Sequence, residues 1–278
     1  MSAKVLCIGD VMLDVVTKIA VMPSEINYGS DTPAQISTHG GGAAGNVAAW
    51  LTRTDARATI VGHVGNDSAG AALVNEFDAL GVRHHNLVVD NGHSGVVVVL
   101  VDPTGERTMF PDNGANSGLK LSDLPELDGF NAVYISGYSP LDPLSRGGIK
   151  EMIAKIKAAG LTIYFDPASV GGMKDVDTHE IKSWLPLMDV LLLNEEEATY
   201  LTGLTDIEAA LDQLLQTSTT VVIKRGSHGA IGKSRGGESV AASCVPRNCC
   251  YWRTAPSVAG RRVETHSGFL ACPREPVL

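Results

Sequence analysis

The chain has 278 residues, of which 44% are hydrophobic and 19% charged, and it carries a net charge of −9. This length and apolar content supply a sizeable buried core, which excludes intrinsic disorder. The acidic balance argues against nucleic acid and anionic membranes as partners, and the apolar stretches are too short to span a bilayer. Asp10 and Asp14 interrupt what would be the apolar region of a signal peptide, so we expect a cytoplasmic protein.

Short apolar runs alternate with helix-like stretches through residues 1–243, which we treat as one domain. Strands are predicted over residues 4–8, 58–64, 131–135, 162–165, 190–193 and 220–224. Helices are predicted over residues 45–52, 68–79, 144–159, 195–202 and 207–216. Most of the strands are continuous Val/Ile/Leu runs, as expected for strands buried on both faces. The pattern predicts an α/β fold with a mostly parallel central sheet.

Two segments, about residues 13–38 and 95–110, alternate apolar and polar residues instead. Such alternation is typical of antiparallel, partly exposed strands. We therefore expect a small β-layer that projects from the main sheet.

A glycine motif at residues 40–45 satisfies G-x-G-x-x-G. A dinucleotide site needs a buried strand directly before the first glycine, whereas the polar segment 33–39 stands there. Two interpretations remain, a helix entry with only a packing role and a glycine-lined pocket in which backbone N–H groups and Asn46 meet a polar ligand. We favour the pocket.

A second glycine motif, GSHGAIGKS at residues 226–234, ends like a P-loop but has one residue too many between its glycines. A P-loop must open a helix, and the RGGES sequence that follows it at residues 235–239 would start a helix poorly. The motif therefore predicts a strand, a turn and a second strand.

The last 35 residues differ in composition from the rest, because they hold four of the five cysteines and a charge of +3 against −12 for the preceding 243. A disulfide framework is improbable in a cytosolic chain. A metal site built from Cys244, Cys249, His266 and Cys272 lacks the paired spacing of zinc ligands. We favour a third interpretation, that a shifted reading frame or an unusual splice produced residues 244–278.

Six short motifs follow one another over residues 4–240. They are GDVMLD at 9–14, GGAAGNVAA at 41–49, IVGHVGNDSAG at 60–70, FDP at 165–167, LNEEEATYLTG at 193–203 and VIKRGSHG at 222–229. In this order they resemble the ribokinase-like (PfkB) family of carbohydrate kinases. The resemblance implies a three-layer α/β/α fold with a small β-lid that closes over a sugar, and the two alternating segments stand where that lid would be.

By this resemblance the protein would transfer the γ-phosphoryl group of ATP to a hydroxyl of a sugar or sugar-like molecule. Asp14 would accept hydrogen bonds from substrate hydroxyls, and Asn46 would offer them a donor and an acceptor. Gly41 and Gly42 would let the backbone approach the sugar. Tyr138 is a weaker candidate for the same pocket, because a packing role is expected for it.

The resemblance also implies a nucleotide side. Its residues are Asn194, Lys224, Gly226, Ser227 and Gly229, with Glu197 as the metal residue acting through water. The alternative for 194–197 is a helix N-terminus that is rich in acids for dipole reasons. Asp166 either serves the phosphate and metal region or forms a plain strand-end turn. The expected cofactors are ATP and Mg²⁺, a monovalent cation is allowed, and the sequence does not decide whether a homodimer forms through the β-lid.

The family's second signature, D-T-x-G-A-G-D, is absent from the 278 residues. Its last Asp is the family's catalytic base, so the sequence identifies no catalytic residue. Near residues 250–258, where the motif is expected, the chain reads CYWRTAPSV. Phosphoryl transfer depends on positioning and charge stabilisation, so this loss should be severe, and missing helices should leave sheet surface exposed. Two functions stay open, a carbohydrate kinase impaired in this chain and a catalytically inactive sugar- or nucleotide-binding protein.

Overall fold

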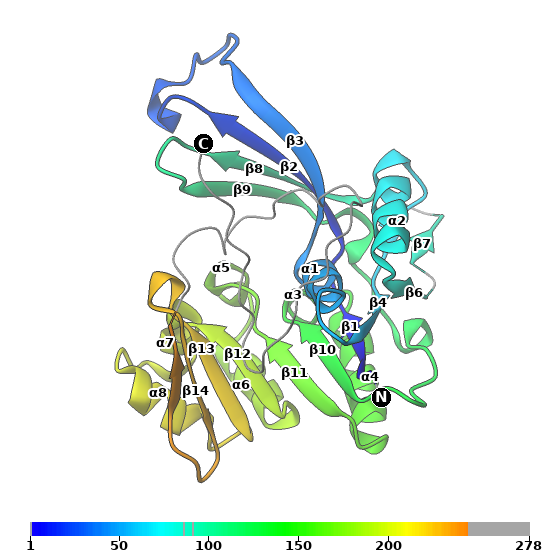
Figure 1. Cartoon of the computed structure of the whole chain (residues 1–278), viewed down its shortest axis with the longest axis vertical. Coiled ribbons are helices and arrows are strands. Elements are labelled where there is room, and N and C mark those ends of the chain that lie inside the picture. The colour runs from blue at the N-terminus through cyan, green and yellow to red at the C-terminus, as the bar shows by residue number, and fades with distance from the viewer. Residues whose placement is uncertain (1, 86, 91, 244–278) are drawn as a thin grey trace.

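A central sheet of nine strands forms the body of the protein in a computed structural model that describes residues 2–85, 87–90 and 92–243 (Figure 1). In sheet order the strands are β15 (Val240–Ala242), β14 (Ala230–Ser234), β13 (Thr220–Lys224), β12 (Val190–Asn194), β11 (Thr162–Asp166), β10 (Ala132–Ser136), β1 (Lys4–Ile8), β4 (Arg57–Val61) and β6 (Arg83–His84). The strands from β13 to β6 are parallel, whereas β14 pairs antiparallel with both β13 and β15. The prediction of a mostly parallel sheet is confirmed.

The strand predicted over 58–64 is wrong as a single element. β4 ends at Val61, and a two-residue strand β5 (Val64–Gly65) then pairs with β7 (Val88–Val89). Gly62, between them, lies so close to Gly9 that an added Cβ would come within 2.5 Å of the Gly9 carbonyl oxygen. This close approach turns the chain away from the sheet.

Eight helices are found in the part of the chain that the structure describes. They are α1 (Ala43–Leu51), α2 (Ser68–Leu80), α3 (Tyr138–Leu141), α4 (Arg146–Ala158), α5 (Val170–Met173), α6 (Thr178–Trp184), α7 (Glu195–Thr202) and α8 (Ile207–Leu214). The predicted helices correspond to α1, α2, α4, α7 and α8. The other three span four to seven residues, too short for a period of 3.6 to be visible in the sequence.

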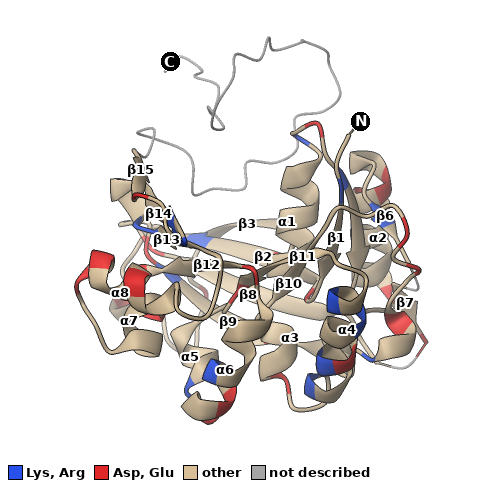
Figure 2. Cartoon of the chain, turned by 90° about the horizontal axis from the view of Figure 1, so that it is seen from below, with Lys and Arg blue, Asp and Glu red and all other residues tan. Residues whose placement is uncertain are grey.

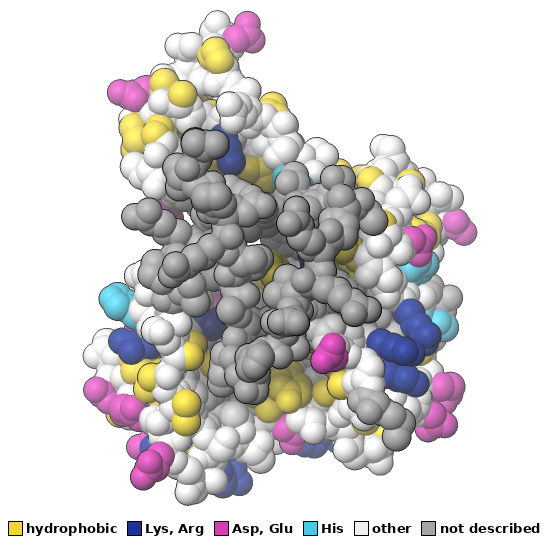
Figure 3. All heavy atoms as spheres, viewed as in Figure 1, with side chains coloured by type: hydrophobic (Ala, Val, Ile, Leu, Met, Phe, Trp, Pro, Cys, Tyr) yellow, Lys and Arg dark blue, Asp and Glu magenta, His cyan; other side chains and the backbone are white. Residues whose placement is uncertain are grey.

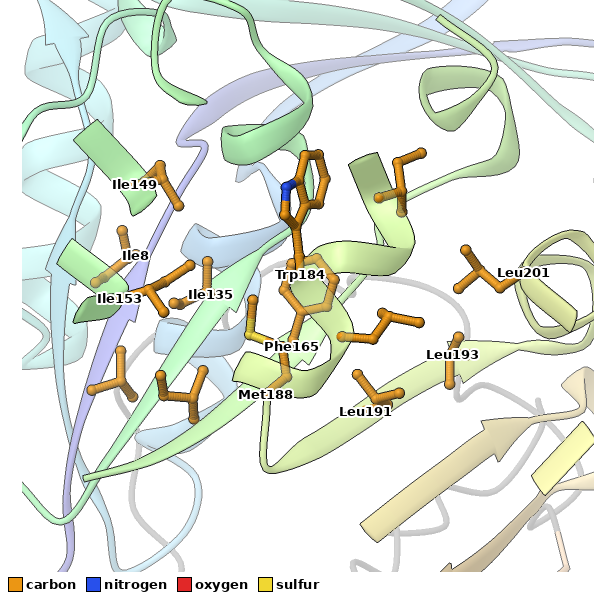
Figure 4. Close-up of a cluster of buried hydrophobic side chains, with 14 of the residues drawn as sticks. Ile8, Ile135, Ile149, Ile153, Phe165, Trp184, Met188, Leu191, Leu193 and Leu201 are labelled. Atoms are coloured by element: carbon orange, nitrogen blue, oxygen red, sulfur yellow. The ribbon is translucent and has the colours of Figure 1, made fainter. Parts of the chain in front are cut away.

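Two hydrophobic clusters lie on opposite faces of the sheet. The larger joins β10–β13 to α4, α6, α7 and α8, with Phe165 and Trp184 among its fully or nearly fully buried side chains (Figure 4). The smaller joins β1 and β4 to α1 and α2. Tyr164, beside Phe165 on β11, is 37% exposed, so this strand is buried on one face only.

A second sheet projects from the body as a lid (Figure 1). Its order is β3 (Ala34–Gly41), β2 (Met12–Ile19), β8 (Gly95–Val101) and β9 (Arg107–Asp112). The predicted small β-layer is therefore present at the predicted segments. The expectation of antiparallel strands fails for one pair, because β2 and β8 both leave the body in the same direction and pair in parallel.

No helix of the described residues is long and apolar enough to cross a membrane. Acidic residues gather on α7 and α8, and basic residues on α4 (Figure 2). The tail at residues 244–278, with its four cysteines and the expected position of the missing signature, lies outside the described residues.

Candidate active site

Polar residues form two clusters at the edge where the parallel strands have their carboxyl ends. The lid cluster, at the junction of body and lid, consists of Asp10, Asp14, Gly41, Gly42 and Asn46. The edge cluster, at the ends of β11, β12 and β13, consists of Asp166, Asn194, Glu197 and Lys224. The four main residues predicted for the sugar side, Asp14, Gly41, Gly42 and Asn46, thus lie in the first cluster, whereas the weaker candidate Tyr138 does not. Asn194, Glu197 and Lys224, predicted for the phosphate side, lie in the second.

Asp14 lies on β2, opposite His39 of β3. Burial, with Asp10 as the next contributor, raises the pKa of Asp14 to about 6, while Arg107 on β9 acts to lower it. An ionised Asp14 is therefore available near neutral pH as a hydrogen-bond acceptor, as predicted, but it loses its charge in mild acid.

The two predicted glycines are required by their surroundings. Gly42 has a φ of +83°, and a Cβ there would collide with the Asp10 carbonyl oxygen. A Cβ at Gly41 would collide with the Asp14 carboxyl group. The absence of side chains keeps the backbone open beside Asp14.

Asn46 lies in the first turns of α1, where its N–H donates to the Gly42 carbonyl oxygen at 2.9 Å. Its side-chain Oδ1 is buried and has no hydrogen-bond partner in the described structure. A buried acceptor without a donor is costly, so this atom is suited to accept a hydrogen bond from a ligand.

Asp10 is a residue that the sequence motifs contained but did not single out. Its carboxylate accepts hydrogen bonds from the Ala43 N–H and the Ser136 hydroxyl, both at 2.6 Å. Glu76 of α2 similarly accepts from the Gly40 N–H at 2.9 Å. The signal in the sequence was an acid directly after a buried strand, but its partners are far away in the chain.

Lys224 and Asp166 form the centre of the edge cluster. The Lys224 Nζ lies 2.7 Å from Oδ2 of Asp166, although the strands that carry them are separated by β12. Lys224 is half-exposed, which leaves its ammonium group accessible to an anion. The pairing favours a role in the phosphate region over a plain turn for Asp166.

Asn194 and Glu197 form a capping box at the start of α7. The Asn194 side-chain oxygen accepts from the Glu197 N–H at 2.8 Å, and Asn194 donates through its backbone and side-chain nitrogens to the two Glu197 oxygens at 2.8 and 2.6 Å. Glu197 is only 2% exposed, and burial raises its pKa to about 7. The residues thus lie at a helix N-terminus rich in acids, as the alternative expected, with a capping box that it did not include, and the carboxyl group keeps lone pairs for a further contact.

Gly226, Ser227 and Gly229 form a short 3-10 turn (Gly226–His228) and its end, between β13 and the antiparallel β14. Both glycines have positive φ, +51° and +85°. The prediction of a strand–turn–strand segment in place of a P-loop is confirmed. The turn follows directly after Lys224 and belongs to the same edge of the sheet.

Tyr138 lies between the two clusters. Its pKa is raised, first by burial, and the charges of Asp10, Glu197 and Asp166 act to raise it further. Its side chain hydrogen-bonds to Ser169, and the residue is 44% exposed. This exposure is more than the expected packing role requires.

A divalent cation fits the edge cluster only together with another ligand. Within the described ranges no group of three or more His, Cys, Asp or Glu side chains could hold a metal ion. Mg²⁺ is usually held by one or two carboxylates together with substrate phosphates. Glu197 and Asp166 supply two carboxylates, which lie close enough for the charge of Asp166 to raise the pKa of Glu197. This donor set suits such an ion.

The fold and the two clusters define an α/β protein with a lid over a polar site and a second site suited to anions. Residues 2–249 match the pfkB family of carbohydrate kinases, and the chain belongs to this family.

Relatives of known name support this assignment. The chain is 29% identical to an ATP-dependent ribose-1-phosphate kinase of Halopiger xanaduensis over 82% of this chain and 72% of the relative. It is 29% identical to a fructokinase of Vibrio alginolyticus over 66% of this chain and 62% of that protein, so it spans less than two thirds of the fructokinase.

Solved structures agree with the fold. A ribokinase of Giardia lamblia superposes with a TM-score of 0.74 at 25% identity, covering 89% of this chain and 77% of the other. An E. coli structure in complex with ATP and Mg²⁺ has a TM-score of 0.75 at 23% identity, covering 89% and 80%. The predicted ribokinase-like fold is confirmed.

Proposed function

We propose that this protein binds a sugar or sugar-like molecule under its lid and transfers a phosphoryl group to one of its hydroxyls from ATP. The observation that carries the proposal is the pair of clusters on one edge of the sheet, with acceptors in one and an accessible cation in the other. Membership of the pfkB family supports it. The identity of the sugar is left to experiment.

In the lid cluster, Asp14 and Asn46 bind the sugar hydroxyls. The ionised Asp14 carboxylate accepts from two hydroxyls, and Asn46 Oδ1, which is otherwise unpartnered, accepts from another. Gly41 and Gly42 leave room for the ring against the backbone.

In the edge cluster, Lys224 neutralises phosphate charge, and the turn with Gly226, Ser227 and Gly229 presents backbone N–H groups to the nucleotide. Asn194 holds the end of β12 in place through the capping box. Glu197, with Asp166, would hold Mg²⁺ together with the phosphates and through water. When bound, this ion neutralises charge that develops on the transferred group. A monovalent cation has no donor set that we can assign in the described residues.

A second candidate function rests on the missing D-T-x-G-A-G-D signature. Without a base for the attacking hydroxyl, the chain would bind sugar or nucleotide and not turn over. Isothermal titration calorimetry with neutral sugars, followed by a coupled assay for ADP, separates the two functions. Binding with ADP release supports the kinase, and binding without it supports the inactive protein. No binding to any neutral sugar contradicts the kinase, and no binding to ATP or ADP as well contradicts both.

Two variants test the sugar site in the same titration. Asp14→Asn and Asn46→Ala should each weaken sugar binding at least tenfold, because the first replaces a charged acceptor by an amide donor and the second removes the side-chain amide. Asp55→Asn, at an exposed carboxylate on the body, is the matched control and should bind like the wild type.

We also propose a homodimer through the lid face that does not carry Asp14. On this face the side chains of the two central strands, β2 and β8, are all uncharged. Ile36 of β3, Val98 of β8 and Phe110 of β9 are 66%, 39% and 57% exposed there. Figure 3 shows exposed hydrophobic side chains on the lid. In a chain of net charge −9, an uncharged face is where a second copy can approach without repulsion.

The dimer is tested by light scattering coupled to gel filtration. Phe110→Glu should produce a monomer. Met109→Glu is the matched control, because Met109 is a similarly exposed neighbour at 54% on the opposite face of the same strand. A wild-type monomer, or equal effects of both variants, contradicts the proposal.

The proposed cellular location is the cytoplasm. The buried free thiol of Cys7 is compatible with a reducing compartment. Fractionation of cells that express the tagged chain tests this.

A further inference from the structure

The carboxyl group of Asp10 connects three segments of the chain. Asp10 follows β1, and its two oxygens bind the N–H of Ala43, at the start of α1, and the hydroxyl of Ser136, at the end of β10. Ser136 is fully buried. Both distances are 2.6 Å, in the range of hydrogen bonds to charged groups.

The backbone of Asp10 also binds the first turn of α1. Its carbonyl oxygen accepts from the Gly45 N–H at 3.2 Å, and it lies so close to Gly42 that no side chain fits there. Side chain and backbone of one residue thus bind two N–H groups of the first turn of α1. These groups have no partner within the helix itself.

This turn carries the sugar-binding groups of the proposed function. Gly41 and Gly42 precede it and Asn46 follows within one turn. An error of about 1 Å in such a turn would displace these groups from a ligand.

We propose that Asp10 is a positioning residue of the sugar site, which fixes the Gly41–Gly42 turn and the start of α1 against the end of β10. It does not touch the sugar in this proposal. The proposal rests on the sugar site proposed above, and it adds a residue to it.

The charged groups around Asp14 come from several elements. Asp10 and Glu76 of α2 act to raise its pKa, and Arg107 of β9 acts to lower it. His39 is its cross-strand neighbour on β3. Because Asp10 is the largest contributor after burial, its neutralisation should let Asp14 ionise at lower pH.

The test is sugar affinity as a function of pH, with D-ribose and D-fructose as probes, between pH 5 and 8. In the wild type, binding should weaken below a midpoint near the pKa of Asp14, about 6. Asp10→Asn should weaken binding at pH 8 at least tenfold and move the midpoint to lower pH. Ser136→Ala should weaken binding less and leave the midpoint nearly unchanged.

Asp123→Asn is the matched control for a merely structural effect. Asp123 is also buried, and it pairs with His63 at 3.2 Å away from the lid cluster. Its variant should lose stability without a shift of the midpoint. An Asp10→Asn protein with wild-type affinity and midpoint would overturn the proposal.

A second measurement, hydrogen exchange, tests the positioning role of Asp10 even if no sugar binds and the proposed function fails. Hydrogen exchange on the ligand-free protein reports the Ala43 and Gly45 amides, which Asp10 binds. In Asp10→Ala the Ala43 amide should exchange at least tenfold faster, while Gly70, capped by Asp67 on α2, stays unchanged. Equal exchange at Ala43 in variant and wild type contradicts the positioning role.

Discussion

The Lys224 ammonium group and the Asp166 carboxylate meet at 2.7 Å across the end of β12, which separates their strands. The contact joins two residues 58 positions apart in the chain. It places a half-exposed cation beside the acids of the edge cluster, at the point where the strands end.

We expect Lys224→Gln to weaken ADP binding at least tenfold, because a lost charge-assisted contact costs roughly 1.5–3 kcal/mol. Calorimetry measures the affinity. Lys233→Gln is the control, since Lys233 also pairs with an acid, Asp212, at 2.6 Å but on the far end of the hairpin. Equal losses in the two variants would point to general electrostatics.

Asn194→Ala should lower the free energy of unfolding by about 1 kcal/mol, the usual effect of removing an N-cap, and should also impair nucleotide binding. Asp206→Ala removes the N-cap of α8, at the exposed Ala209 N–H. Its cost in stability should be similar, with nucleotide binding retained. Urea denaturation and calorimetry give the two values for each variant.

Ala168 is the one residue other than glycine with a positive φ, +82°, among the described residues, and it follows the Asp166–Pro167 pair. Its N–H donates to Asp166 Oδ1 at 3.1 Å, which holds the turn. Ala168→Val should lower the free energy of unfolding by about 1–2 kcal/mol, because a β-branched side chain is strained at this φ.

Ala168→Gly should cost nothing or stabilise the chain, because glycine adopts this φ without strain. At Ala71, an exposed interior position of α2, the same exchange should cost about 1 kcal/mol. Equal destabilisation by the two glycine variants would show that Ala168 carries no strain.

The stability of the wild type should fall as the pH rises from about 4 to about 6. Burial raises the pKa of Asp14 from 3.8 to about 6, so the folded chain keeps a proton that the unfolded chain loses in this window. Asp14→Asn should flatten this part of the curve, and the remaining slope reflects Asp10 and Glu197, whose pKa values are also raised. Thermal unfolding at intervals of pH measures both, and a variant with the full wild-type slope would disprove the assignment.

The DNA downstream of the Ser243 codon should contain D-T-x-G-A-G-D in another reading frame. We expect this because four of the five cysteines and the change in charge begin at residue 244, just ahead of the missing motif. Sequencing the coding region tests it. Absence of the motif from all three frames would favour the inactive binding protein.

Local patterns in the sequence predicted most elements of the body. β1 and α7 have the predicted bounds, because apolar runs and capping residues act within a few positions of one another. The short α5 and α6 were missed, and the split between β4 and β5 depends on the packing of Gly62 against Gly9. That contact joins residues that no local pattern connects.

The residues of the candidate site also divide into those that local motifs predicted and those that depend on contacts between remote segments. Asp14, Gly42 and Asn46 were found because each belongs to a short motif in the chain. Asp10 was not identified as a site residue, because its partner Ser136 is 126 positions away and its burial is visible only in the folded protein.

The sequence by itself determined where the longer helices and most strands of the body form and which polar residues stand at their ends, because these depend on the chemistry of neighbouring residues. Only the tertiary structure decided that β2 and β8 pair in parallel, that Lys224 meets Asp166, and that Asp14 holds its proton up to a pH of about 6. Register, ion pairing and burial depend on distances between remote segments, which are fixed when the sheet and its helices pack.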